Sequence, residues 1–112
     1  IIVAPCHKEA KWGYVFRDCT IDGNEAAANV KKWGVKLGRP WHNSPKTVYI
    51  HTTMNIPISP EGWANMGAIP TLFAEYNSRD AAGNVLQLDQ RKTEYEGRGE
   101  NAPKGRGCYL YL

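Results

Sequence analysis

The chain has 112 residues, which is enough for one small domain with a single core. Charged residues make up 22% and hydrophobic residues 42%, a balance typical of globular proteins that argues against wholesale disorder. The net charge of +3 is small, and nucleic-acid binding would call for a concentrated basic stripe, so we expect no nucleic-acid partner. The longest uncharged stretch, Thr47–Pro60, contains a histidine and two prolines, and we therefore expect no membrane span.

The chain opens on an apolar segment, Ile1–Pro5, whose composition is typical of a buried strand. A buried strand at the first residue needs neighbouring chain to cover it. Two interpretations follow, a piece of a longer protein or a mature chain processed at this point, and we favour the first.

Short runs rich in β-branched and aromatic residues predict strands along most of the chain. Glycine, proline, asparagine and aspartate separate these runs, as expected for an all-β protein. The stretch Asn24–Lys32 has a helix-like composition but almost no apolar face, so it is at most a surface turn of helix or a loop. No two-residue Asn-Gly or Asp-Gly connection joins matched runs, and we predict no hairpin among them. The predicted strands are Tyr14–Ile21, Thr47–Thr53, Thr71–Tyr76 and Val85–Leu88.

The first predicted strand contains a change of phase. Phe16, Cys19 and Ile21 are apolar, so simple alternation slips by one residue at Arg17-Asp18. A short turn there would end one strand and begin another with both still pointing apolar residues inward. Such corners are typical of a parallel β-helix, in which every interior coil has a coil on each side. We therefore predict a parallel β-helix, with a fragment of a β-sandwich as the competing interpretation.

The three cysteines, Cys6, Cys19 and Cys108, cannot all pair within the chain. They form no Cys-x-x-Cys pair and have no histidines at zinc-ligand spacing, so we expect no metal site. Cys19 is predicted to be an inert, buried thiol, because no cationic cluster is in place to lower its pKa.

The densest motif is Leu37–Asn43, in which Gly38 and Pro40 flank Arg39 and stiffen the backbone. Trp41 stands two residues on and would point to the same side of an extended segment. A guanidinium beside a flat aromatic surface suits an acidic sugar. The alternative is that Arg39 pairs with a structural aspartate and Trp41 fills a corner of the core.

Other candidate residues favour structural interpretations. Trp63 is expected to close the core, and Met66 either packs there or contacts a ligand. No Gly-x-Ser-x-Gly segment is present for a serine nucleophile. The Gly-rich segment from Gly97 to Gly107 is interpreted as a solvated loop. The aspartates are interpreted as solvated turn residues; they are Asp18, Asp22, Asp80 and Asp89.

Four motifs follow one another in a fixed order: Leu37–Trp41, Lys46–Ile50, Ile58–Trp63 and Phe73–Ser78. This ordered series resembles the C-terminal half of the pectinesterase (pectin methylesterase) family over about residues 12 to 95. The Asn65-Met66 pair and the segment Arg79–Asn84 look more bacterial than plant-like. The resemblance implies a right-handed parallel β-helix, with residues 1–112 as part of a catalytic domain whose upstream coils are absent.

The resemblance also implies an activity, the hydrolysis of methyl esters of pectin without metal or cofactor. In the family one Asp attacks the ester carbonyl, a second serves as acid and base, and Gln side chains stabilise the oxyanion. The motif carries two further roles onto this chain: Arg39 orients the nucleophilic carboxylate and Trp41 packs against the sugar. Met66 matches another sugar contact. A secreted or periplasmic location is expected.

The departure from the family pattern is at the start. Nothing before Arg39 resembles the segments that carry the two aspartates and the glutamine, so the chain is expected to begin after them and to be inactive alone. The remaining N-terminal part of the enzyme is then the expected partner, with pectin the substrate. The C-terminal segment Gly105–Leu112 also differs from the family. The alternatives are a non-catalytic β-helical module that binds acidic polysaccharide and, less favoured, a small protein that binds single-stranded nucleic acid.

Overall fold

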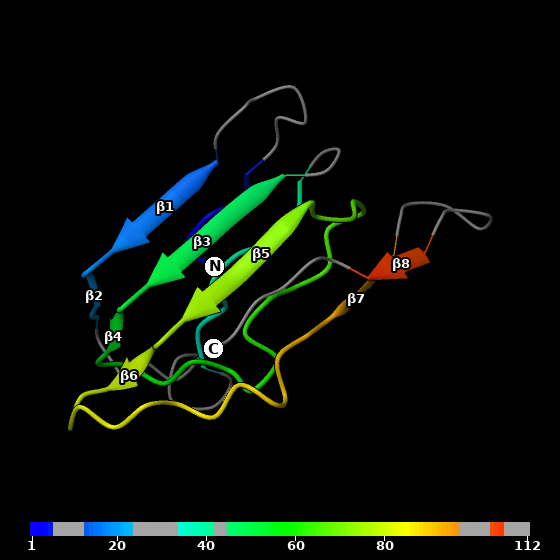
Figure 1. Ribbon diagram of the computed structural model, residues 1–112. Coiled ribbons are helices and arrows are strands. Elements are labelled where there is room, and N and C mark those ends of the chain that lie inside the picture. Colours follow the sequence, from blue (N-terminus) through cyan, green and yellow to red (C-terminus); the bar gives the residue numbers. More distant parts are fainter. Residues whose placement is uncertain (6–12, 24–33, 42–44, 97–103, 107–112) are drawn as a thin grey trace.

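The computed structural model describes residues 1–5, 13–23, 34–41, 45–96 and 104–106, and these contain strands and loops but no helix. The larger sheet has the order β1-β3-β5, with every pair parallel (Figure 1). Its strands are β1 (Tyr14–Arg17), β3 (Lys46–Ile50) and β5 (Leu72–Tyr76). The all-β prediction is confirmed for the described residues, and parallel pairing differs from the antiparallel sheets of a β-sandwich.

A second parallel sheet continues directly from the ends of the first. It has the order β2-β4-β6, formed by β2 (Thr20–Ile21), β4 (Thr53–Met54) and β6 (Arg79–Asp80). Each strand of the first sheet and the short strand that follows it form one layer: β1 with β2, β3 with β4, and β5 with β6. In each layer a residue with positive φ makes the corner between the two sheets, namely Asp18 (54°), His51 (49°) and Asn77 (58°). Aspartate, histidine and asparagine are the residue types enriched in this left-handed region. The predicted turn after Arg17 is confirmed.

A third line of parallel contacts closes the layers on another side. Gly38 bridges Val3 on one side and Trp63 on the other, and Val35 bridges Ile58. These are isolated bridges rather than strands, because Gly, Pro and Trp interrupt the alternation that a longer ladder needs.

The core lies between these three sides and is mainly aromatic. The Phe16 and Tyr49 rings are stacked at 4.7 Å between centroids, and the Trp63 and Phe73 rings at 4.3 Å. Tyr95 meets Phe73 edge-on. In register, Phe16, Tyr49 and Glu75 occupy one inward row, so this row ends in a charged residue inside the core.

Several boundaries differ from the sequence predictions. The expected strand Thr47–Thr53 is broken at His51, where the chain turns the corner. The segment Val85–Leu88 forms only one antiparallel bridge, from Val85 to Arg79, because the turn before it folds back on β6. Asn24–Lys32 lies outside the described residues.

The expectation of a loop over Gly97–Gly107 is corrected at Lys104–Arg106, which forms a strand. The strand β8 (Lys104–Arg106) pairs antiparallel with β7 (Glu94–Glu96), and neither strand lies within the four predicted strands. No helix within the described ranges is long and apolar enough to cross a membrane.

Cys19 is only partly buried, which corrects the prediction of a core thiol. The residue lies at the corner between β1 and β2 rather than within a strand, and its Sγ donates to the Arg17 carbonyl at 3.4 Å. Cys6 and Cys108 lie outside the described residues.

Candidate functional site

The segment Leu37–Trp41 lies between two other parts of the chain that run beside it. On one side the Arg39 amide donates to the Val3 carbonyl, at 3.1 Å, and the Trp41 amide to the Pro5 carbonyl, at 3.1 Å. On the other side the Ala64 amide donates to the Gly38 carbonyl at 3.0 Å. The motif is therefore held by backbone hydrogen bonds on both edges.

Gly38 permits this close approach. A Cβ at position 38 would lie 3.2 Å from the Trp63 indole and 3.2 Å from both the side chain and the carbonyl oxygen of Val3. Such spacing is tighter than ordinary van der Waals contact, so a larger residue would force the flanking segments apart. The glycine before Arg39 thus sets how near the motif lies to its neighbours.

Arg39 is partly buried, and its Nε has no exposed surface and no hydrogen-bond partner among the described residues. A buried guanidinium N–H without an acceptor is costly, because the group has lost its water without replacement. The best acceptor is a carboxylate, which binds a guanidinium through charge-assisted hydrogen bonds. The alternative prediction, a pairing with a structural aspartate, finds no partner for this Nε in the described ranges.

The two tryptophans of the described motifs lie in opposite environments. Trp41 is 45% exposed, whereas Trp63 is 1% exposed and stacks on Phe73. The prediction that Trp63 closes the core is confirmed, and Trp41 does not fill a corner of it. Trp41 has an aromatic surface that a ligand can reach.

Met66 is partly buried and lies three residues after Trp63, on the segment beside the one that carries Trp41. Gly38 bridges Trp63, and Trp41 and Met66 each follow their own bridge residue by three positions on parallel segments. The Gly38–Trp63 bridge and the hydrogen bond from the Ala64 amide to the Gly38 carbonyl bring these two segments together at Gly38. Arg39, Trp41 and Met66 thus come from two adjacent stretches of the third side.

Of the predicted turn aspartates, Asp18 lies at a corner as predicted, whereas Asp80 is the last residue of β6 and binds the turn that follows. Asp80 accepts from the amides of Ala82 and Asn84, both at 2.9 Å. The hydrogen bond from the Asn84 amide is the largest cause that lowers the pKa of Asp80 below its ordinary value. Asp18 is exposed at the corner after β1. None of these carboxylates is placed beside Arg39 by a contact in the described part of the chain.

A cavity of about 550 Å³ lies elsewhere, between the segment after β4 and residues 86–91. Asn55, Ile56, Leu86 and Gln87 contribute to its lining, whereas Arg39, Trp41 and Met66 do not. The cavity is therefore separate from the candidate site.

Within the described ranges no three His, Cys, Asp or Glu side chains gather as a metal site would require.

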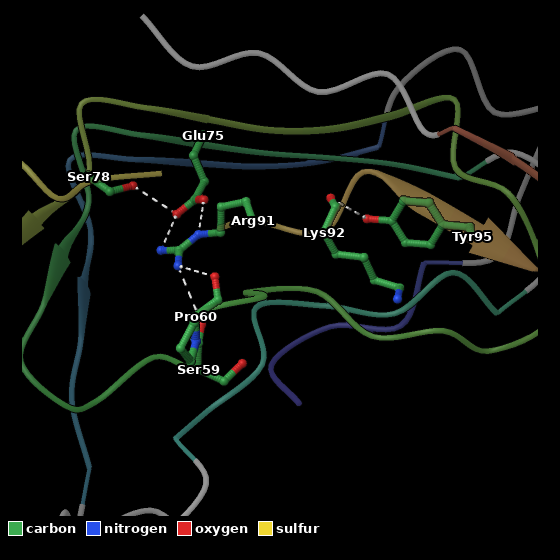
Figure 2. Close-up of polar contacts among 7 residues, drawn as sticks. All are labelled: Ser59, Pro60, Glu75, Ser78, Arg91, Lys92 and Tyr95. Carbon is green, nitrogen blue, oxygen red and sulfur yellow. Dashed lines mark hydrogen bonds and ion pairs between the residues drawn. The ribbon is translucent and has the colours of Figure 1, made fainter. Parts of the chain in front are cut away.

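A buried polar network that was not predicted from the sequence lies next to the site. Glu75 on β5 accepts from Arg91 Nε at 2.6 Å and from Arg91 Nη2 at 3.2 Å, and Ser78 Oγ donates to it at 3.1 Å (Figure 2). The inward position of Glu75 was the available signal, since it alternates with Phe73 on the same strand. Nothing local in the sequence marks Arg91 as its partner.

Stacked parallel strands around an aromatic core define an all-β protein. Among its described residues, Arg39 has a buried Nε without a hydrogen-bond partner, and Trp41, two positions on, is exposed. A model of the family described as Pectinesterase matches residues 3–98, so the chain belongs to the pectinesterase family. The resemblance drawn from the motifs is confirmed.

Individual relatives agree with the family assignment. The chain is 36% identical over 79 residues to "Probable pectinesterase/pectinesterase inhibitor 13" of Arabidopsis thaliana, which covers 65% of this chain and 13% of that protein. It is 36% identical over 82 residues to "Probable pectinesterase 50" of the same plant, covering 70% of this chain and 20% of the relative. The chain thus spans a fifth or less of these two relatives. No solved structure matches the chain. Because these relatives are plant proteins, the bacterial resemblance stays a prediction.

Proposed function

We propose that residues 1–112 form the C-terminal coils of the catalytic domain of a pectinesterase, folded as a right-handed parallel β-helix. Three lines of parallel contacts, with a corner residue in each layer, support this fold. The exposed apolar residues Tyr14 and Val15, on the outer strand β1, suit a position beside a preceding coil. The family match supports the assignment to a catalytic domain.

In this proposal Arg39 orients the carboxylate that attacks the methyl ester. The observation that carries it is the buried Nε, which has no hydrogen-bond partner in the described part of the chain. A buried cationic N–H requires an acceptor, and a carboxylate supplies the strongest one. That carboxylate belongs to the upstream part of the enzyme, together with the acid–base aspartate and the oxyanion glutamine that the family uses. A fixed guanidinium keeps the nucleophile ionised and aimed, which lowers the cost of reaching the transition state.

Trp41 and Met66 bind the substrate in the same proposal. The exposed indole offers a flat face to a galacturonate ring, and the thioether adds an adaptable apolar surface. The reaction converts methyl-esterified polygalacturonate into pectate and methanol. The nucleophilic carboxylate forms an acyl-enzyme as methanol leaves, and water then releases the acid. The proposal includes neither a metal nor a cofactor, and it places the enzyme outside the cytoplasm, secreted or periplasmic.

The test is methanol release from highly methyl-esterified pectin by the full enzyme that contains this chain, and by residues 1–112 alone. The proposal expects release by the full enzyme and none by residues 1–112, which lack the nucleophile. Retention of both proteins on pectate without methanol release by either would instead favour a non-catalytic module that binds acidic polysaccharide.

A further inference from the structure

Glu75 and Arg91 form an ion pair that is almost completely withdrawn from solvent. Their side chains are 2% and 7% exposed, and two hydrogen bonds join the guanidinium to the carboxylate. Ser78 Oγ occupies a further acceptor position of Glu75. This arrangement satisfies the carboxylate and fixes the orientation of the guanidinium plane.

The remaining nitrogen of Arg91 binds the turn that leads into the site. Nη1 donates to the Pro60 carbonyl at 3.1 Å and to the Ser59 carbonyl at 3.3 Å (Figure 2). Gly62 makes room for the arginine stem, because a Cβ there would lie 2.5 Å from Arg91 Cδ. Arg91 therefore joins β5 to the turn at residues 59–62.

This turn is in direct backbone contact with the segment that carries Arg39. The Leu37 amide donates to the Gly62 carbonyl at 2.6 Å, and the Ala64 amide donates to the Gly38 carbonyl. A displacement of the turn would therefore move the backbone on both sides of Gly38, next to Arg39. The contacts form a continuous path from Glu75 through Arg91 and the turn to the site.

We propose that Glu75 and Arg91 are positioning residues for the ester hydrolysis, which set the place of Arg39 and Trp41 through the turn at residues 59–62. This inference rests on the proposed function. Neither residue touches substrate. Their role is to fix the distance between β5 and the segments bridged at Gly38 and Trp63. At this distance Arg39 meets its carboxylate. Misplacement of a catalytic group by about 1 Å lowers the rate by about a hundredfold, so a small shift of the turn is sufficient to matter.

The test uses the full enzyme with Arg91→Lys. Lysine keeps the charge opposite Glu75 but lacks the planar fork, in which Nε and Nη2 bind the carboxylate while Nη1 binds the two carbonyls. We expect kcat for methanol release to fall by about tenfold or more and KM to change by less than about threefold, because orientation of a nucleophile is more demanding than binding. In enzyme labelled with 5-fluorotryptophan, the ¹⁹F resonance of Trp41, assigned by its loss in Trp41→Phe, should move.

A second variant and a wild-type measurement guard against unfolding. The double variant Glu75→Met/Arg91→Met removes both charges together, which buried pairs tolerate better than the loss of one partner. It should move the Trp41 resonance in the same way. In the wild-type enzyme the amides of Leu37 and Lys92 donate to carbonyls of this turn, and the Ala64 amide, just after the turn, donates to the Gly38 carbonyl. After correction for the intrinsic exchange rate of each sequence position, these three amides should exchange with solvent at rates that differ by less than about threefold.

The matched control is Arg79→Lys. Arg79 also donates from two nitrogens, to Gly83 and Asn77, but it lies on the second sheet. It should leave kcat and the Trp41 resonance unchanged. Three results for a folded Arg91 variant would overturn the proposal. They are an unshifted Trp41 resonance, a kcat within twofold of wild type, and a loss of kcat equal to that of the control. So would exchange rates of the three amides that differ by more than tenfold. An inactive wild-type enzyme would refute the proposed function instead, while the resonance would still test the link from Arg91 to Trp41.

Discussion

The hydroxyl of Tyr49 donates a hydrogen bond to the carbonyl oxygen of Leu37 at 2.8 Å, inside the core. This bond joins β3 to the segment that carries Arg39, two residues before that arginine. Both residues are fully buried, so water cannot replace the bond if it is lost.

The first prediction concerns this bond. Tyr49→Phe keeps the ring that stacks on Phe16 but leaves the Leu37 carbonyl without its donor. We expect the free energy of unfolding to fall by about 1–3 kcal/mol, the range for an unsatisfied buried polar group. Chemical unfolding followed by circular dichroism measures the loss. The control is Tyr14→Phe, where the side chain is exposed, and equal stability losses in the two variants would contradict the account.

The second prediction is a loss of stability at alkaline pH. Burial, and then the negative charge of Glu75, raise the pKa of Tyr49, and burial also raises the pKa of Tyr95. An unfolded tyrosine ionises near pH 10, so below that pH the two phenols are protonated in both the folded and the unfolded state. Their contribution to the free energy of unfolding is then fully present. Above about pH 10 the unfolded state loses protons first, and stability declines as the pH rises through the raised pKa values of the folded state.

The measurement is the free energy of unfolding between pH 8 and pH 11. The wild-type enzyme should lose stability more steeply above about pH 10 than Tyr49→Phe, which has one buried phenol fewer. Absorbance of tyrosinate near 295 nm should rise together with unfolding. Parallel curves for the two proteins would show that Tyr49 ionises as easily in the folded state as in the unfolded one.

The third prediction separates the two tryptophans. Trp41→Ala should raise KM for pectin by roughly fivefold, the equivalent of about 1 kcal/mol of aromatic contact, with little change in stability because the ring is 45% exposed. Trp63→Ala should destabilise the fold by about 3–5 kcal/mol, because it removes a buried ring from the stack with Phe73.

Steady-state kinetics of the two variants measure the change in KM, and thermal unfolding of the same variants measures the loss of stability. Trp41→Phe serves as the control, since it keeps a flat apolar ring and should recover part of the affinity. A Trp41→Ala enzyme with unchanged KM would remove this residue from the sugar-binding surface.

Sequence patterning predicted the parts of this fold that depend on local residue choice. The slip at Arg17-Asp18 predicted a corner, and the structure has Asp18 in the left-handed region there, with His51 and Asn77 at the same place in the next layers. The corner at His51 was missed because the apolar pattern runs through it without a glycine or proline. The burial of Trp63 and the exposure of Trp41 differ because of their neighbours in space, although both tryptophans follow glycine- and proline-rich turns.

Long-range contacts account for what the sequence could not predict. Arg91 reaches Glu75 across 16 positions and Ser59 across 32, and no periodicity links such distant residues. Likewise β7 and β8 pair across a long connection that has no short-turn signature. The roles of Arg39 and Trp41 came from the resemblance of the motif, and the structure adds a buried Nε that needs an acceptor.

The measurement that most directly tests the central claim is the kcat for methanol release by the full enzyme with Arg39→Ala, compared with wild type and with Arg39→Lys. If Arg39 orients the nucleophilic carboxylate, kcat should fall by about a hundredfold or more in Arg39→Ala while KM changes little, and Arg39→Lys should recover only part of the loss, because it lacks the planar fork. A folded Arg39→Ala enzyme that releases methanol at the wild-type rate would contradict the role assigned to this arginine.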